Sequence, residues 1–147
     1  MITLDTNIFI YALDDRFPAK QAVAAEVVRH AARLDAPICL QVVGEAQNVA
    51  RRKLKMPGFV AAQIGRNILG QFATFSPSVE DAEIALGQLA AGRLSYWDAI
   101  LLACAQRAGC TALLSEDLQD GARILGIEIV NPFDGDEMSE RARALLS

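Results

Sequence analysis

Three aspartates occur where a short strand-like segment of this sequence gives way to a polar or helical one. Asp5 directly follows the strand-like start of the chain, and Asp117 follows the strand-like residues 111–114. Asp98 lies in the first turn of a predicted helix that begins near Ser95. Because the carboxyl ends of parallel strands meet at one edge of an open α/β sheet, where such sheets bind ligands, we expect the three carboxylates to lie together.

Glu45 is a fourth candidate, in a predicted helix over residues 42–55. It lies on the same side as the apolar residues Val42 and Val49, and its partner four residues later is that valine rather than a lysine. An ordinary ion pair along the helix surface is therefore not available to it. This favours a functional role, with an arginine from elsewhere in the fold as the alternative partner.

Each aspartate also has a purely structural explanation. Asp5 suits the N-cap of the helix that begins near Ile8, and Ser95 with Asp98 has the spacing of a capping box. Asp117 and Asp120 have the same spacing at the start of a further turn. Each aspartate taken alone therefore fits either a helix cap or a functional site, and the combination of the three favours a functional site.

Clustered carboxylates repel one another, so either some are protonated or a divalent cation lies among them. Cys39, Cys104 and Cys110 form no CxxC pair and fall in apolar segments, so we expect free cysteines in the core. The only histidine, His30, is four residues after Glu26 and is expected to form an exposed helical pair. An all-oxygen ligand set suits Mg²⁺ or Mn²⁺, and such a centre can activate water and neutralise charge on a phosphate. The expected metal ligands and catalytic residues are Asp5, Glu45, Asp98 and Asp117.

The elements that must position these residues alternate between strand and helix, which predicts an α/β fold with a mostly parallel sheet. We expect one domain over residues 1–147, with Glu116 as an exposed loop acid. Apolar periodicity and turn residues predict strands at 1–4, 37–41, 111–114 and 127–130, and helices at 8–13, 19–34, 42–55, 59–72, 78–92, 95–107, 122–125 and within 136–147.

Composition narrows the class of protein. Hydrophobic residues make up 52% of the chain, yet no apolar run is as long as a membrane span, and Met1 leads into a strand rather than a signal peptide. We therefore expect a cytoplasmic protein that does not enter a membrane. The net charge of −4 argues against a broad basic surface for nucleic acid. The basic cluster of Arg51, Arg52, Lys53 and Lys55 fits either phosphate contacts at a site or a solvated helix end.

Taken in order, these motifs resemble the PIN domain, and in particular the VapC-type toxins of bacterial toxin–antitoxin systems. The resemblance rests on residues 2–7, on Glu45, and on residues 96–99, 115–121 and 131–133. It implies a three-layer α/β/α sandwich, a Mg²⁺ or Mn²⁺ site, endoribonuclease activity, a separate antitoxin protein and a homodimer. The acidic quartet of the family matches Asp5, Glu45, Asp98 and Asp117, and supporting polar positions match Thr6, Ser115 and Asp120.

The expected chemistry is in-line attack of a metal-activated water on phosphorus, which leaves a 5′-phosphate and a 3′-hydroxyl. This attack does not use the 2′-hydroxyl, so the preference for RNA rests on the resemblance alone. An aspartate-nucleophile phosphatase would carry an acid where Asn7 stands, and a receiver domain would carry adjacent acids at the first strand. The open alternatives are an RNA-processing nuclease outside a toxin–antitoxin system and a non-catalytic binding module.

Overall fold

The computed structural model describes all 147 residues and has a parallel sheet at its centre. Strands β1 (Ile2–Leu4), β4 (Ala112–Leu114) and β6 (Ile127–Val130) lie side by side and parallel, and β5 (Arg123–Ile124) adds an antiparallel edge. In this register Leu4 pairs with Leu114 and Leu114 with Val130. The three parallel strands therefore end level with one another, and the residues that follow them share one edge.

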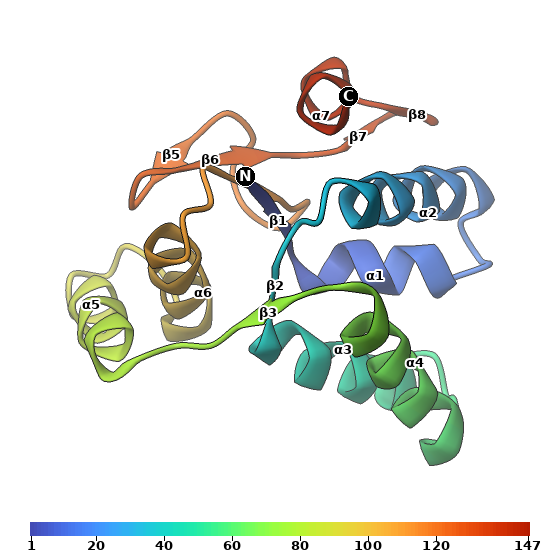
Figure 1. Cartoon of the computed structure of the whole chain (residues 1–147), viewed down its shortest axis with the longest axis horizontal. Helices are drawn as coiled ribbons and strands as arrows, with labels where there is room; N and C mark the ends of the chain where they lie inside the picture. Colours follow the sequence, from blue (N-terminus) through green and yellow to red (C-terminus); the bar gives the residue numbers. More distant parts are fainter.

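Helices cover both sides of these strands, so the predicted three-layer α/β/α sandwich is confirmed. Figure 1 shows α1 and α2 on one side of the central strands and α5 and α6 on the other. A second parallel pair joins β2 (Ile38–Cys39) to β3 (Thr74–Phe75), and a hairpin joins β7 (Phe133–Asp134) to β8 (Glu137–Met138). The helices are α1 (Thr6–Leu13), α2 (Pro18–Arg33), α3 (Leu40–Arg52), α4 (Gly58–Gln71), α5 (Val79–Ala90), α6 (Tyr96–Arg107) and α7 (Glu140–Leu146).

The central strands are buried on both faces, as their nearly continuous apolar sequences predict. Leu4, Leu113 and Ile129 are completely buried in one apolar core with the inner faces of the surrounding helices. The three cysteines are free and buried in this core region, which confirms their expected role as small core residues. None of the helices is long and apolar enough to cross a lipid bilayer.

The C-terminal third differs from expectation. Residues 122–125, predicted as helix, contain β5, which pairs with β6 through the two-residue turn Leu125–Gly126. Both turn residues have positive φ, 49° and 80°, which is the backbone that a tight hairpin requires. Leu125 is apolar and is not a typical turn residue, so the local sequence does not indicate a turn here. The short strands β3, β7 and β8 were also not predicted, because two residues carry no periodicity.

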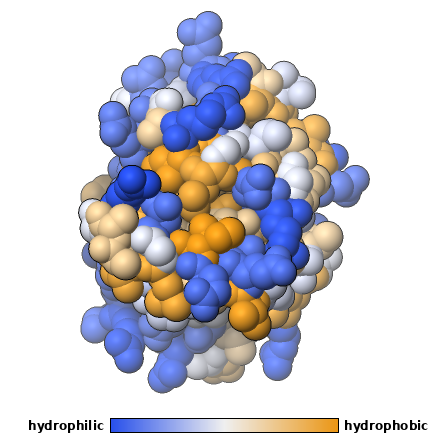
Figure 2. Space-filling view, turned by 90° about the vertical axis from the view of Figure 1, so that its left-hand side faces the viewer, coloured by the Kyte–Doolittle hydropathy of each residue, from blue (hydrophilic) through white to orange (hydrophobic).

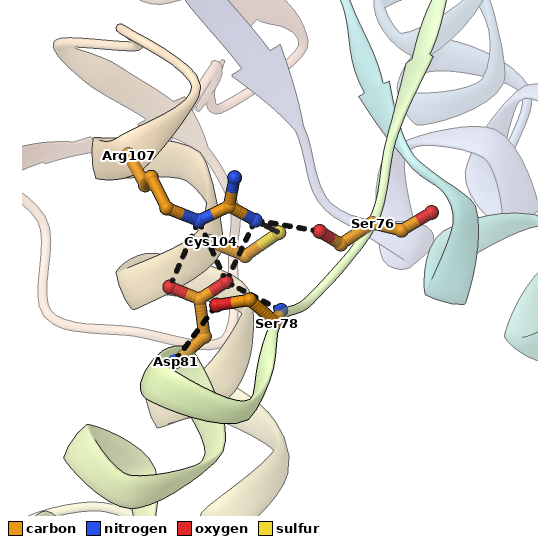
Figure 3. Close-up of polar contacts among 5 residues, drawn as sticks. All are labelled: Ser76, Ser78, Asp81, Cys104 and Arg107. Atoms are coloured by element: carbon orange, nitrogen blue, oxygen red, sulfur yellow. Dashed lines mark hydrogen bonds and ion pairs between the residues drawn. The ribbon is translucent and has the colours of Figure 1, made fainter.

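An ion pair between a buried aspartate and a partly exposed arginine fixes α5 against α6 (Figure 3). Arg107 of α6 donates hydrogen bonds to Asp81 of α5 at 2.8–3.3 Å and to the carbonyl oxygen of Ser76 at 2.7 Å. Ser78 and Asp81 also complete the predicted capping box of α5. Burial alone would raise the pKa of Asp81, but hydrogen bonds from Arg107 and Ser78 and the charge of Arg107 lower it below its usual value. The pair therefore holds α6, and with it the N-terminal turn that carries Asp98.

Helix α5 exposes four large apolar side chains, those of Val79, Ile84, Leu86 and Leu89. Figure 2 views the side of the molecule on which α5 lies in Figure 1, and apolar side chains gather in the middle of this face among polar ones. Most surface helices of a monomer present polar side chains to solvent, so this face is unusual.

Candidate active site

The four acids singled out from the sequence line one cavity. The cavity has a volume of about 360 Å³, and Asp5, Glu45, Asp98 and Asp117 all contribute to its wall. Asp5 directly follows β1, Asp117 is the third residue after β4, Glu45 lies in the second turn of α3, and Asp98 lies in the first turn of α6. Three separate parts of the chain thus converge with its N-terminus at the carboxyl edge of the sheet.

Asp5 is the buried member, with 7% of its surface exposed. Its carboxylate accepts hydrogen bonds from the backbone N–H of Thr6 at 2.7 Å and from the hydroxyl of Ser115 at 2.7 Å. Burial raises the pKa of Asp5 to about 6, since the two hydrogen bonds only partly offset the loss of hydration and the charges of Asp117 and Asp98 add to it. Asp5 is also the N-cap of α1, so the cap and the site are the same residue.

Asn7 links the acids at the bottom of the cavity. Its side-chain amide donates to Asp117 at 3.0 Å, to the hydroxyl of Ser115 at 3.3 Å and, more weakly, to Asp5 at 3.4 Å. Its carbonyl oxygen accepts from the backbone N–H of Glu116 at 3.4 Å. Sequence reasoning gave Asn7 no role in the site; the usable signal was its place two residues after Asp5, on the first turn of the same helix.

Glu45 is held by two side chains. Thr6 donates a hydrogen bond to one carboxylate oxygen at 2.9 Å, and Gln41, one turn earlier on α3, donates to the other at 2.7 Å. No arginine pairs with it, so the alternative structural explanation is not realised. Thr6 therefore connects the start of α1 to α3, and it matches one of the supporting positions expected from the resemblance.

The carboxylate of Asp98 takes no part in helix capping, unlike that of Asp81 at the equivalent position of α5. Ser95 accepts a hydrogen bond from the backbone N–H of Asp98 at 3.2 Å, but the Asp98 carboxylate makes no hydrogen bond back to the cap. In α5, by contrast, Asp81 closes the box in both directions. The capping box expected at Ser95 is thus only half formed, and the Asp98 carboxylate remains free at the cavity wall.

Other expectations for charged residues need correction. Asp117 and Asp120 cap no helix, because the chain turns back into β5 instead, and Asp120 accepts a hydrogen bond from the backbone N–H of Asn131 outside the cavity. Glu116 is not a fully exposed loop acid: it is half-buried and forms an ion pair with Lys20. Of the basic cluster after Glu45, Lys53 lines the cavity.

The donor set fits a hydrated divalent cation. All four candidates offer carboxylate oxygens, the ligands that Mg²⁺ and Mn²⁺ prefer, and no lysine or arginine forms an ion pair with any of the four. No group of three or more acidic, histidine or cysteine side chains is close enough together to ligate one ion directly. An ion held by one or two carboxylates and several waters satisfies this spacing, and Mg²⁺ commonly binds in that manner.

Comparison with known proteins agrees with the fold and the sequence motifs. The model of the PIN domain family matches residues 2–119, a range that includes all four acids. Among solved structures, a toxin–antitoxin complex from Klebsiella pneumoniae is similar with a TM-score of 0.62 and 25% sequence identity, over 91% of this chain and 99% of that chain. Comparison with curated protein sequences gave no match. Since the family model covers well over half of the sequence, this chain belongs to the PIN domain family.

Proposed function

We propose that this protein is a metal-dependent endoribonuclease and the toxin of a type II toxin–antitoxin system. PIN domains are generally nucleases. The observation that carries the proposal is the convergence of Asp5, Glu45, Asp98 and Asp117 on one cavity at the carboxyl edge of the sheet.

Each residue around the cavity has a distinct part in the proposed reaction. A Mg²⁺ or Mn²⁺ ion, when bound, would activate a water for attack on phosphorus and neutralise charge on the phosphate. Asp5, Asp117 and the free carboxylate of Asp98 would hold it, one or two of them directly and the others through water ligands. Glu45, fixed by Thr6 and Gln41, would orient a water ligand or the attacking water. Lys53 at the cavity wall supplies a positive charge for the phosphate.

The toxin role is supported by the similar structure from Klebsiella pneumoniae, which is a toxin–antitoxin complex. We infer a separate antitoxin protein as a partner, and a cytoplasmic location, where both RNA and such a partner are found. We also infer a homodimer, for which the exposed apolar side of α5 offers a surface. An RNA-processing nuclease outside such a system would use the same cavity, so the alternative differs in partner and target rather than in chemistry.

The first test is cleavage of a mixed RNA substrate with Mn²⁺, with Mg²⁺ and with chelator. Wild type should cleave only with metal, Asp98→Asn should lose the activity, and Asp136→Asn, an exposed acid in the β7–β8 hairpin, should retain it. The products should carry 5′-phosphates, and a 2′-deoxy nucleotide at the cleaved position should still be cut. Equal cleavage by Asp98→Asn would refute the site, and failure of Mn²⁺ to bind by calorimetry would favour the non-catalytic binding module.

A further inference from the structure

A second cleft adjoins the carboxylate cavity, and no part of the substrate has been assigned to it above. It has a volume of about 510 Å³ and is lined by Gln41, Gly44, Glu45, Gln47, Asn48 and Trp97. Glu45 belongs to the walls of both hollows, and Trp97 precedes Asp98 in the chain. A ligand that crosses Glu45 would therefore contact the acids and this cleft together.

The floor of the cleft is one face of α3. Residues 41, 44, 45 and 48 have the spacing of a single helix face, and Gly44 lies in their middle. A Cβ atom added at Gly44 would meet no atom within 4 Å, so no neighbouring element requires a glycine there. Glycine inside a helix is less stable than alanine by about 0.5–1 kcal/mol. What the glycine does provide is an open floor between the side chains on either side of it.

Trp97 forms the wall of the cleft. Its side chain is 63% exposed, and its ring meets the ring of Tyr96 edge to face, with centroids 5.1 Å apart. An edge-to-face contact with a single ring covers at most one of the two faces of the indole. Trp97 thus presents a large apolar surface to the space above Gly44.

The polar groups of the cleft are mainly amides. The side chain of Asn48 makes no hydrogen bond within the chain, and that of Gln47 donates one N–H to the carbonyl oxygen of Gly44, at 2.9 Å, which leaves the side-chain carbonyl oxygen of Gln47 free. Glu45 is the only charged residue in the lining, and no lysine or arginine is present. This composition does not fit a phosphate, which needs positive charge, but it fits an uncharged planar group with hydrogen-bonding edges.

We propose that this cleft binds one unpaired nucleobase of the RNA, stacked on Trp97 and hydrogen-bonded to the amides of Asn48 and Gln47. The inference rests on the proposed function, since the backbone of the same RNA places its phosphate at the carboxylate cavity. Single-stranded RNA is recognised by this combination of an aromatic platform and amide side chains. The cleft would therefore confer a requirement for an unstacked base beside the cleaved bond.

The test uses the fluorescence of Trp97, which is the only tryptophan in the chain. Wild type is titrated in chelator, so that no metal-dependent turnover occurs, with a mixed-sequence RNA octamer and with an abasic octamer of equal length and charge. We expect the RNA to quench Trp97 and the abasic octamer to quench it far less. Binding of labelled RNA, followed by anisotropy, should weaken about 5- to 150-fold in Trp97→Ala, as expected for the loss of one stacked base, and should be largely retained in Trp97→Phe.

Two further variants test whether a loss of RNA binding is specific to the cleft. Gly44→Leu places a side chain in the cleft, at a position where an added Cβ atom meets no atom within 4 Å, and should weaken RNA binding while Trp97 is still present. Phe59→Ala removes an aromatic ring that is 78% exposed on α4, outside both hollows, and should bind RNA as wild type does.

The possible outcomes test the nucleobase site and the proposed nuclease activity separately. Base-dependent quenching without metal-dependent cleavage would keep the nucleobase site and reject the proposed activity. Cleavage by wild type, combined with RNA binding by Trp97→Ala and Gly44→Leu within twofold of wild type, would overturn the nucleobase site alone. Loss of partner-protein binding in Trp97→Ala with unchanged RNA binding would also overturn it, by assigning the cleft to a protein side chain.

Discussion

Replacement of Asp5 by asparagine should stabilise the fold at neutral pH, although it removes a proposed metal ligand. The change from aspartate to asparagine preserves shape and removes charge from a site that is 7% exposed. Burial and the neighbouring carboxylates raise the pKa of Asp5 from 3.8 to about 6. That difference corresponds to about 3 kcal/mol of destabilisation by the ionised carboxylate at high pH.

Asparagine introduces one local conflict. The Ser115 hydroxyl donates to Asp5 and accepts from Asn7 and from the backbone N–H of Asp117. An amide N–H at position 5 would leave that hydroxyl proton without its acceptor, at a cost of about 1 kcal/mol. The expected net gain in unfolding free energy at pH 8 is thus about 2 kcal/mol, or about 4–8 °C in Tm for a chain of this size.

The sign of the stability difference between Asp5→Asn and wild type should depend on pH. Because the pKa of Asp5 is raised by folding, protonation stabilises the folded state; this stabilisation is complete below pH 3.8 and is lost as the pH rises through about 6. At pH 4 the ionisation penalty in wild type falls to about 0.5 kcal/mol, so Asp5→Asn should be slightly less stable than wild type there. The advantage of the variant should appear between pH 4 and 7.

Urea unfolding in chelator at pH 4, 5, 6, 7 and 8 measures this difference directly, with Asp136→Asn as a control for the removal of an exposed charge. Chelator is required because a bound cation would stabilise the ionised wild-type carboxylate. A variant that is less stable than wild type at pH 8, or a difference that does not vary with pH, would refute the reasoning about Asp5.

Two further substitutions test how the site is held. Thr6→Val removes the hydroxyl that donates to Glu45 at 2.9 Å and should lower metal-dependent cleavage about 10- to 100-fold with little change in Tm. Thr6→Ser keeps the hydroxyl and should retain activity. Equal activity in the two variants would contradict an orienting role for Thr6. Arg107→Ala leaves the Asp81 carboxylate without its guanidinium partner and should lower the Tm by roughly 5 °C, as thermal unfolding would measure. Because folding lowers the pKa of Asp81, this loss should shrink as the pH falls below about 4. A loss that does not change with pH would indicate lost packing rather than lost charge.

Most of the layered fold could be predicted because its main elements carry strong local signals. The buried strands are short apolar runs, and the long helices show an apolar face and recognisable caps, as at Ser78 and Ser95. The site could be located because a parallel sheet brings Asp5 and Asp117 to one edge whatever the details of packing.

The details that failed depend on contacts between distant residues. Arg123 and Ile124 form a strand because β6 is available to pair with them, and two residues are too few to show the alternation that marks a strand. Glu116 is half-buried because Lys20, 96 residues away, reaches it. The amide of Asn7 bridges Asp5 and Asp117 only once β1 lies beside β4, so its role is a property of the fold and not of the local motif.

The pairing of β1 with β4 has a consequence for the order in which the protein is made. Ile2 pairs with Ala112, so the first strand waits for a partner that is synthesised about 110 residues later. Non-local parallel pairing of this kind is slow to form, and a growing chain completes it only after β4 has left the ribosome. Asp5 and Asp117 cannot meet before then. A growing chain that has not yet exposed β4 therefore lacks the assembled carboxylate cavity, and the proposed activity cannot appear on the ribosome before that point.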